Sequence, residues 1–427
     1  MKKVLKTIIV AVLARQVRQL RKKNSFKIIG VVGGIGKTST KMAIAHTLSA
    51  ANTRVRWQEG NYNDIVSVPL VLFGQDMPSL LNPFAWTKVI ITNTLQLFKK
   101  YPYDVVVLEL GTDGPGQIAA FKKYLQLDIA VVTSVVSEHM EYFDDLQAVA
   151  VEELSVSTFS NLVVYNADFV APEFRNLLPG ASIAYGMHDT SAKYRVSNVF
   201  QSAGALEADV KFGEEILLHI TQELVSEVQL YSVLAAVIIG HQLQIKPIDI
   251  KHGLMGIRPV SGRLRRLRGI NNSIIIDDTY NASPEAMKAG LQALYKLQAN
   301  QKIAILGNMN ELGQISMLAH KEIGEMCDPS QLSLVVTIGP DANDYLAPAA
   351  EARGCKVRAF NNPYDAGEYV ESKIESGAII FAKGSQNKVF AEEAVKQILA
   401  DPEDVNKLVR QSGYWLKHKK SIFKDRI

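Results

Sequence analysis

A glycine-rich loop between a predicted strand and a predicted helix constrains the fold of this chain more than any other feature. The run Gly33-Gly34-Ile35-Gly36-Lys37-Thr38-Ser39 follows the apolar segment KIIGVV and opens the helical stretch TSTKMAIAHTLS. Glycines let the backbone wrap around a phosphate, and the amino end of the helix adds its dipole. Lys37 is expected to reach the outer phosphates of ATP, and Thr38 to bind Mg²⁺. The usual spacing has a glycine where this chain has Val31, so a purely structural turn is the alternative.

Strands alternate with helical stretches along most of the chain. Short apolar runs such as YDVVVLELG and DIAVVTSV are typical of buried parallel strands. Three runs that alternate more openly, YRVSNVF, ADVKFG and EILLHI, predict a small antiparallel patch at the edge of the same domain. A second alternating set, from SIIIDD to GAIIFAKG, predicts a second open sheet. We expect an α/β protein with a central phosphate-loop ATPase domain on a parallel sheet and a C-terminal Rossmann-like α/β domain.

Length and composition fit this organisation. The chain has 427 residues, of which 47% are hydrophobic and 21% charged, which is enough for more than one core. The Gly- and Arg-rich run GLMGIRPVSGRLRRLRG is typical of a domain junction. We predict a basic amphipathic helix over residues 1–25, the central domain over 26–257 and the C-terminal domain over 258–427. The basic tail after Asp401 is expected to form a helix and a solvated terminus.

Net charge and cysteine content exclude several classes of protein. A formal net charge of +4 is too small over this length to indicate nucleic-acid binding. Cys327 and Cys355 have neither metal-ligand spacing nor the number expected of a disulfide framework. We interpret them as reduced and structural, which favours a cytoplasmic protein.

The N-terminal segment combines basic and apolar residues that a helix would place on separate faces. The basic face holds Arg15, Arg18 and Lys22, and the apolar face holds Leu13, Val17 and Leu20. The apolar stretch over residues 8–14 is far short of the ~20 residues that span a bilayer. A signal peptide is the other interpretation of such a stretch, but the phosphate loop that follows needs cytoplasmic ATP. Two hypotheses stay open: packing on the protein with solvated charges, or peripheral contact with an anionic membrane.

Polar residues follow several predicted strands, where ligands bind in open α/β sheets. Glu109 ends VVVLELG, and a carboxylate beside a phosphate loop can bind Mg²⁺ directly or through water. His139 follows DIAVVTSV, although a lone histidine is more often structural. Arg263 and Arg265 lie in the presumed junction, where they could reach a γ-phosphate on domain closure or form a solvated basic turn.

The predicted second sheet also has polar strand ends. These are Asp277, Asp278, Tyr280 and Asn281 after one strand, and Lys383 and Ser385 after another. An aromatic residue next to an asparagine could stack on and hydrogen-bond a nucleobase, but Asp and Asn are also common in turns for local reasons. Lys383 and Ser385 could recognise a carboxylate or a phosphate, or simply form a polar turn.

Together these motifs resemble those of the Mur ligases, the family that adds amino acids to the peptidoglycan precursor. The resemblance rests on GGIGKTST, VVVLELGTDGPGQI, TSVVSEHMEYF, IIDDTYNASPEAMKAGL, ILGNMNELG and AKGSQNK, and it covers nearly the whole chain from residue 26. The pair DDTYNASP and GNMNELG is typical of the branch that joins D-alanyl-D-alanine to a UDP-muramoyl tripeptide. The resemblance implies an ADP-forming amide ligase that uses ATP and Mg²⁺, forms an acyl phosphate, and acts as a cytoplasmic monomer.

The resemblance also implies roles for individual residues. Catalytic roles fall to Lys37, His139, Arg263 and Lys383. ATP binding falls to the phosphate loop with Asp278, Tyr280 and Asn281, of which Asn281 resembles the adenine contact. Metal binding falls to Thr38, Glu109, His139 and Glu153. Asp278, His320, Lys383 and Ser385 match positions around the interdomain cleft of the family.

Four departures from the family pattern bear on function. The short basic helix stands where the family has a domain that binds the UDP-sugar. Glu153 aligns with a family lysine that CO₂ carbamylates and that supports the second Mg²⁺. Either Glu153 supplies the carboxylate in place of the carbamate, directly or through water, or it is a solvated helix residue beside a weaker metal site. Gln229 and Gln386 replace a family asparagine and arginine, and these changes bear on substrate contacts.

Two other functions stay open alongside the cell-wall ligase. One is a ligase of the same chemistry that acts on another acid, such as a poly-amino-acid or folate-type substrate. The second is a non-catalytic nucleotide-binding subunit that scaffolds cell-wall enzymes. The change from lysine to Glu153 favours the scaffold, whereas intact Lys37, Thr38, Glu109 and His139 disfavour it.

Overall fold

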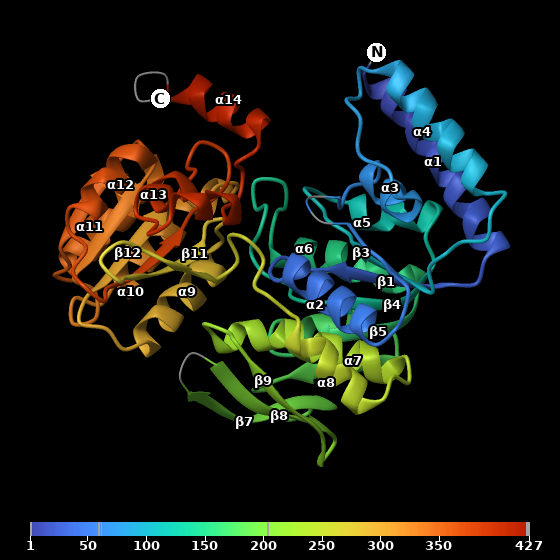
Figure 1. Cartoon of the computed structure of the whole chain (residues 1–427), viewed down its shortest axis with the longest axis horizontal. Helices are drawn as coiled ribbons and strands as arrows, with labels where there is room; N and C mark the ends of the chain where they lie inside the picture. The colour runs from blue at the N-terminus through green and yellow to red at the C-terminus, as the bar shows by residue number, and fades with distance from the viewer. Residues whose placement is uncertain (1, 59, 61, 203–204, 424–427) are drawn as a thin grey trace. The chain divides into compact units, whose positions relative to one another are not determined.

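The computed structural model describes residues 2–58, 60, 62–202 and 205–423, and the chain forms two compact units (Figure 1). The first unit consists of Met1–Val136, Tyr142–Glu223 and Gln229–Ile257. The second unit consists of Ser137–Glu141, Leu224–Val228 and Arg258–Ile427. Both units are α/β, so the predicted fold class is confirmed.

The first unit is built on a mostly parallel sheet. In the described residues its strand order is β2-β3-β1-β4-β5-β6-β7-β8-β9. The strands are β1 Lys27–Val32, β2 Val55–Arg56, β3 Val105–Glu109, β4 Leu127–Val132, β5 Ser160–Asn166, β6 Ser182–Gly186, β7 Tyr194–Ser202, β8 Ala205–Phe212 and β9 Glu215–Gln222. Pairing is parallel from β2 to β7 and antiparallel from β7 to β9, which confirms the predicted antiparallel patch at the edge.

Strand β1 lies in the middle of the parallel region because its side chains can be buried on both faces. Five of its six residues are buried, and all of β3 is buried, as parallel strands covered by helices require. Helix α2 (Lys37–Ala50) follows β1 directly and packs against α7 (Leu230–Gln242) and α8 (Pro247–Met255). This arrangement places the loop between β1 and α2 at the carboxyl edge of the sheet.

Helix α1 (Lys2–Lys23) belongs to the first unit and packs against α3 (Ser67–Phe73) and α4 (Pro83–Gln96). Its predicted apolar face is buried at Leu13, Val17 and Leu20, whereas the basic face is exposed. The two predicted faces are therefore confirmed, and the apolar face is used inside the protein. Among the described residues, no helix is long and apolar enough to cross a membrane.

The second unit is built on a smaller sheet whose described strands have the order β10-β11-β15-β12-β13-β14. The strands are β10 Arg265–Arg268, β11 Ile274–Asp278, β12 Lys302–Gly307, β13 Leu334–Ile338, β14 Val357–Phe360 and β15 Ile379–Lys383. The helices are α9 Pro284–Lys296, α10 Ser316–Met326, α11 Ala347–Ala352, α12 Pro363–Glu371, α13 Glu392–Gln397 and α14 Gly413–Ile422. Strand β10 pairs antiparallel with β11; the junction-like composition of this segment gave no sign of a strand.

Two hydrophobic clusters cover opposite faces of the second sheet. Ile276 and Phe381 belong to one cluster, and their neighbours Ile275 and Ile380 belong to the other. This alternation explains the unbroken apolar runs in the sequence, because both faces of each strand are buried. Both cysteines are free and buried in the second unit.

The predicted helix of the tail is confirmed, whereas the end of the predicted solvated terminus, residues 424–427, lies outside the described residues. The basic run gave no sign that Lys419 is buried. The tail does form a helix, α14, but the side chain of Lys419 is completely buried and is paired with Glu392 at 2.9 Å and with Glu393. Its ammonium also donates to the carbonyl of Arg410 at 2.9 Å, while the Arg410 guanidinium bonds Glu392 at 2.8 Å. Both carboxylates come from α13, so Lys419 ties the tail to the body of the unit.

Replacing Lys419 by methionine should therefore destabilise the second unit strongly. The substitution leaves two buried carboxylates with less positive charge, and breaking one partner of a buried ion pair costs about 3–5 kcal/mol. Urea denaturation of Lys419→Met would measure this loss. Lys420 is exposed in the same helix, so Lys420→Met should change the free energy of unfolding by less than about 0.5 kcal/mol. Equal effects of the two substitutions would contradict the structural role of Lys419.

Candidate functional site

The loop after β1 has a backbone shape that requires glycine. Gly33 has φ +119°, and a Cβ atom there would lie 2.4 Å from Thr133 Oγ1 and 2.7 Å from the Ser134 nitrogen. Gly36 has φ +85° and is the residue that precedes α2. The first amide N–H groups of a helix have no partner within the helix, so this end of α2 can receive an anion.

The loop is held in place by neighbouring elements. Beyond the end of β4, the hydroxyl of Ser134 accepts the Ile35 N–H at 2.8 Å, and its carbonyl accepts the Gly34 N–H at 3.3 Å. The Lys37 ammonium donates to the carbonyls of Gly33 and Gly34, the latter at 3.1 Å. Lys37 thus lies over the loop that the sequence assigned to phosphate binding, and Thr38 and Ser39 follow it in the first turn of α2.

Glu109 lies next to this loop and is not a surface residue. It is the last residue of β3 and pairs in register with Val31 of β1. Its carboxylate is buried and forms an ion pair with Lys41 at 3.1 Å. Lys41 lies one helical turn after Lys37 in α2, and its role was missed from the sequence. The spacing of four residues from Lys37 was the available signal, since it puts both lysines on one face.

Glu153 is also buried, with only 3% of its surface exposed, so the hypothesis of a solvated helix residue is wrong. It lies in α6 (Leu146–Leu154), which begins where Asp145 accepts the Ala148 N–H at 2.7 Å. One Glu153 carboxylate oxygen accepts the N–H of Gly33 at 2.9 Å. Glu153 therefore contacts the phosphate loop itself, across 120 residues of sequence.

The first unit offers oxygen ligands that suit Mg²⁺. Glu109 lies beside the start of the loop, Glu153 bonds to the loop, and the hydroxyl of Thr38 follows it. Carboxylate and hydroxyl oxygens are the protein ligands that Mg²⁺ takes, usually few in number and completed by water and phosphate. In the part of the chain that the structure describes, no three His, Cys, Asp or Glu side chains gather around a common point. The residues fit a Mg²⁺ site with few protein ligands. Their assignment as metal ligands stays a prediction.

His139 lies in the segment Ser137–Glu141, which is grouped with the second unit. It has a left-handed backbone with φ +57°, and its Nδ1 lies 2.6 Å from a carboxylate oxygen of Glu311. Hydrogen bonding from His139 lowers the pKa of the Glu311 carboxyl. The Glu141 N–H donates to the Glu311 carbonyl at 3.1 Å, so the segment is bound to the GNMNELG loop by two contacts. The predicted role of His139 at a metal is not tested by these contacts.

In the second unit, Asp278 and Lys383 form a buried ion pair of 2.6 Å. They lie opposite each other on the neighbouring strands β11 and β15. Burial lowers the pKa of Lys383, whose ammonium also donates to the Asn281 carbonyl at 2.9 Å. The adjacent Asp277 is fully buried, and burial raises its pKa to about 6. Lys383 therefore positions the turn that carries Tyr280 and Asn281.

Tyr280 and Asn281 already have side-chain partners in the second unit. The Arg263 guanidinium lies 4.1 Å from the centre of the Tyr280 ring, so one face of the ring is covered. The Asn281 side-chain amide donates to Glu138 at 3.2 Å. Arg265, by contrast, is bonded to Ser261 at 2.9 Å and to a backbone carbonyl, which indicates a structural role in β10.

Ser385 and His320 support the GNMNELG loop. The Ser385 hydroxyl accepts the Asn310 N–H at 2.9 Å. His320 is buried, its Nε2 accepts the Met309 N–H at 2.9 Å, and its Nδ1 lies 2.8 Å from the Ser316 carbonyl. These partners require a neutral imidazole, and burial lowers the pKa of His320 accordingly. Both side chains thus shape the loop that binds His139.

The structure therefore gathers the predicted residues into two groups. The first unit brings together the phosphate loop with Lys37, Thr38 and Ser39, and the carboxylates of Glu109 and Glu153. The second unit brings together Arg263, Asp278, Tyr280, Asn281 and Lys383. His139, which is bonded to Glu311, belongs to the same unit and follows Glu138, the acceptor of the Asn281 amide.

Comparison with known proteins gives both sequence and structural relatives. The family model of the Mur ligase middle domain matches residues 31–240, and that of the Mur ligase glutamate ligase domain matches residues 262–386. The UDP-N-acetylmuramoyl-tripeptide–D-alanyl-D-alanine ligase of Bacillus subtilis (strain 168) is 28% identical over 382 residues, which are 88% of this chain and 76% of that protein.

Solved structures share the fold. The crystal structure of MurF ligase from Thermotoga maritima in complex with ADP has a TM-score of 0.74 and 22% identity, over 93% of this chain and 84% of that chain. Folylpolyglutamate synthase of Mycobacterium tuberculosis, complexed with ADP and AMPPCP, has a TM-score of 0.61 and 17% identity, over 90% of this chain and 94% of that chain. At these identities the likeness concerns the fold alone.

Substitution of Gly33 by alanine should abolish tight binding of ATP. The added Cβ would overlap atoms of Thr133 and Ser134, so the loop must move away from the end of β4. We expect at least a tenfold loss of ATP affinity in titration calorimetry. Gly116→Ala is the matched control, because Gly116 also has positive φ, +81°, but a Cβ there meets no atom within 4 Å. Wild-type affinity of Gly33→Ala would show that the loop does not depend on this close approach.

Proposed function

Because the chain belongs to the Mur ligase family, we propose that it is an ATP-dependent, ADP-forming amide ligase that joins D-alanyl-D-alanine to a UDP-muramoyl tripeptide in peptidoglycan precursor synthesis. The resemblance inferred from the motifs is thereby confirmed at the level of the family. The observation that carries the proposal is the glycine-dependent phosphate loop with Lys37 over it and two buried carboxylates, Glu109 and Glu153, at its side. The sequence relative named for this activity supports the choice of substrates.

The reaction consists of phosphoryl transfer followed by aminolysis. The substrate carboxylate attacks the γ-phosphorus of ATP, which gives an acyl phosphate and releases ADP. The amine of D-alanyl-D-alanine then attacks the acyl carbon, phosphate leaves, and the amine loses a proton. Lys37 and the loop amides stabilise the charge that develops on the transferred phosphoryl group. Mg²⁺, when bound, screens the repulsion between the carboxylate and the triphosphate, and Thr38, Glu109, Glu153 and the predicted ligand His139 would hold it.

Residues of the second unit are assigned to the nucleotide and its γ-phosphate. Among the described residues the Arg263 Nε is buried without a hydrogen-bond partner, and a buried donor of this kind suits an anionic ligand. Asn281 is assigned to the adenine with Tyr280 beside it, and Asp278 and Lys383 keep their turn in place. We further assign the protein to the cytoplasm as a monomer, where ATP and the precursor are available.

Glu153 takes the place of the carbamylated lysine in this proposal. Its carboxylate is fixed on the Gly33 N–H, so the charge that the family obtains from CO₂ is built into this chain at the phosphate loop. Glutamate carries this charge on a shorter arm than a carbamylated lysine, so Glu153 would hold Mg²⁺ either directly or through water.

The primary test measures release of ADP and phosphate with Mg-ATP, D-alanyl-D-alanine and the UDP-muramoyl tripeptide, leaving out each substrate in turn. We expect turnover only when both are present.

Lys37→Met should reduce kcat by at least about 100-fold, because it removes a charge that acts on the transition state. Lys99 is exposed in the same unit, and Lys99→Met should leave the rate unchanged. ATP binding without turnover, while a known active ligase works in the same assay, would contradict the substrate assignment and favour another acid or the scaffold.

Substitutions of Glu153 separate its charge from its hydrogen bond. Glu153→Gln keeps an oxygen that can accept the Gly33 N–H but removes the charge, so we expect at least tenfold weaker binding of Mn²⁺ in the presence of ADP, measured by electron paramagnetic resonance. Glu153→Lys should make turnover depend on added bicarbonate, whereas the wild type should be indifferent to it.

Two outcomes would count against the replacement of the carbamate. Wild-type Mn²⁺ affinity of Glu153→Gln would leave Glu153 only the role of holding the loop. A wild-type enzyme that loses activity in CO₂-free buffer would show that a carbamate is still needed elsewhere.

A further inference from the structure

The outer face of α4 carries an apolar stripe that faces solvent. Phe84, Ile91 and Leu95 of α4, and Phe98 in the turn that follows it, have 87%, 54%, 59% and 79% of their surfaces exposed. With Lys88 they are spaced at intervals of four, three, four and three residues, which places them on one side of a helix. At 1.5 Å per residue the stripe is about 21 Å long.

The orientation of α4 is fixed by its opposite face. Trp86 and Val89 pack in a cluster with Ile9 and Leu13 of α1. Gln16 of α1 donates to the Ile90 carbonyl and to the Thr94 hydroxyl, both at 2.9 Å. A long-range polar contact and a hydrophobic cluster therefore hold the stripe outward, and Figure 1 shows α1 and α4 side by side along one edge of the first unit.

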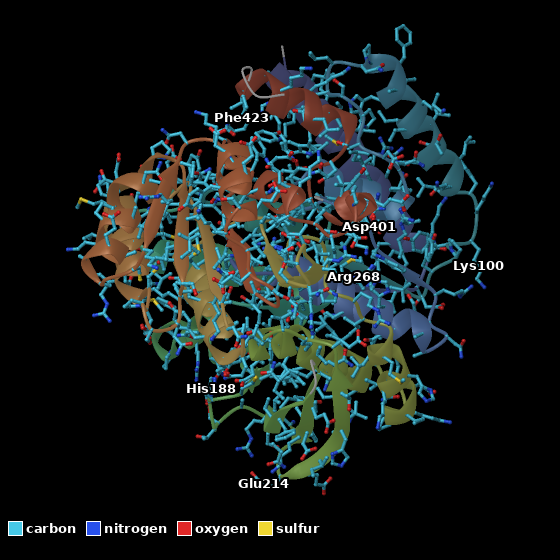
Figure 2. All side chains as sticks on the ribbon, turned by 60° about the vertical axis from the view of Figure 1, so that its left-hand side comes forward. Lys100, His188, Glu214, Arg268, Asp401 and Phe423 are labelled. Carbon is cyan, nitrogen blue, oxygen red and sulfur yellow. The ribbon has the colours of Figure 1, made fainter. Side chains whose placement is uncertain are left out.

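Helices α1 and α4 and the turn after α4 carry basic residues and no acidic ones, while Asp104 and Asp128 line a pocket with Lys22 and Lys23 at the carboxyl end of α1. Neither α1 nor residues 77–103 contain an aspartate or a glutamate. The exposed basic residues here are Lys6, Arg15, Arg18, Lys22 and Lys23 of α1, and Lys88, Lys99 and Lys100 of α4 and the turn after it. The Lys23 ammonium lies 5.0 Å from the centre of the Phe98 ring, so cations reach the apolar stripe itself. Lys100, labelled in Figure 2, lies at the periphery beyond the end of α4.

We propose that the α1–α4 pair is a docking surface for an anionic lipid bilayer. The apolar stripe of α4 inserts at the boundary between headgroups and acyl chains, while the lysines and arginines around it contact lipid phosphates. The apolar face of α1 is buried inside the unit, so α1 contributes charge and α4 contributes the apolar contact.

The charge pattern favours a bilayer over a second copy of the chain. In a dimer formed through this surface, basic residues of one copy would face basic residues of the other, and this contact of like charges is unfavourable. Phe84 and Phe98 also protrude singly at the two ends of the stripe. A rigid protein partner would need a preformed pocket for each ring, whereas a lipid surface accommodates both without one.

The test is sedimentation of the full chain with vesicles of phosphatidylcholine alone and of phosphatidylcholine with 30–40% phosphatidylglycerol (on the order of the anionic content that gives a strong surface potential). We expect binding to the anionic vesicles only, and weakening of that binding at about 0.5 M salt, since screening shortens the reach of charge. The double variant Phe84→Ser, Phe98→Ser should lower the partition coefficient at least tenfold. Phe200→Ser is the control, because Phe200 is 64% exposed in β7, away from α4 in the fold.

Each result decides the proposal. Tenfold loss in the double variant with wild-type circular dichroism and an unchanged Phe200→Ser would support docking through α4. Absence of binding to anionic vesicles, or equal binding to neutral ones, would overturn it. A concentration-dependent dimer that the double variant abolishes, without vesicle binding, would also overturn it and assign the stripe to contact between copies.

Discussion

The close approach of the Gly33 backbone to the end of β4 is the constraint on which the rest of the site depends. Because β1 lies between β3 and β4, the carboxyl ends of all three strands meet at one edge. The loop can turn into α2 only if residue 33 lacks a side chain that would strike Thr133 and Ser134. Once the loop is seated there, the parallel register puts Glu109 beside Val31. One steric condition thus locates the phosphate loop and the first carboxylate together.

Two carboxylates beside a phosphate loop pose an electrostatic problem, since the expected ligand is itself highly negative. Glu109 is compensated by the buried ammonium of Lys41. Glu153 brings a second buried carboxylate to the loop through its bond to Gly33, and a carboxylate beside phosphates is unfavourable unless a cation lies between them. A divalent cation between the carboxylate and the phosphates would convert this repulsion into attraction. The same geometry that looks adverse for nucleotide binding alone is favourable for a nucleotide bound with Mg²⁺.

Sequence patterns predicted the features that depend on residues close in the chain. They did not predict contacts between side chains that lie far apart in the sequence. The parallel strands, the antiparallel patch and the two faces of α1 follow from apolar periodicity, which the burial of Leu13, Val17 and Ile276 reflects. The ion pair of Lys41 with Glu109 and the bond of Glu153 to Gly33 link residues from separate elements. The spacing from Lys37 indicated the helix face on which Lys41 lies, but no local pattern identified the partner of either side chain. Lys419 lies in a basic run that is typical of a solvated tail, yet its side chain is buried and forms ion pairs with two glutamates of α13. The placement of His320 at the interdomain cleft came from resemblance and stays a prediction, while its partners in the structure show that it supports the GNMNELG loop.

The amphipathic pattern of α1 left two hypotheses open, packing on the protein or contact with a membrane, and its apolar face at Leu13, Val17 and Leu20 is buried inside the unit, where α1 packs against α3 and α4. What the sequence did not indicate is that this packing turns a second apolar face outward. Single exposed apolar side chains are ordinary on soluble proteins, and Phe200 is such a case. Three of them on one face of α4 and Phe98 in the turn that follows, within a stretch that lacks acidic residues, form a row of exposed apolar side chains, and apolar surfaces rimmed by polar residues mark interaction sites. The pairing of the two helices therefore buries the apolar face of α1 and turns the apolar stripe of α4 outward. In the proposed docking surface, the exposed basic residues of α1 contact lipid phosphates beside that stripe.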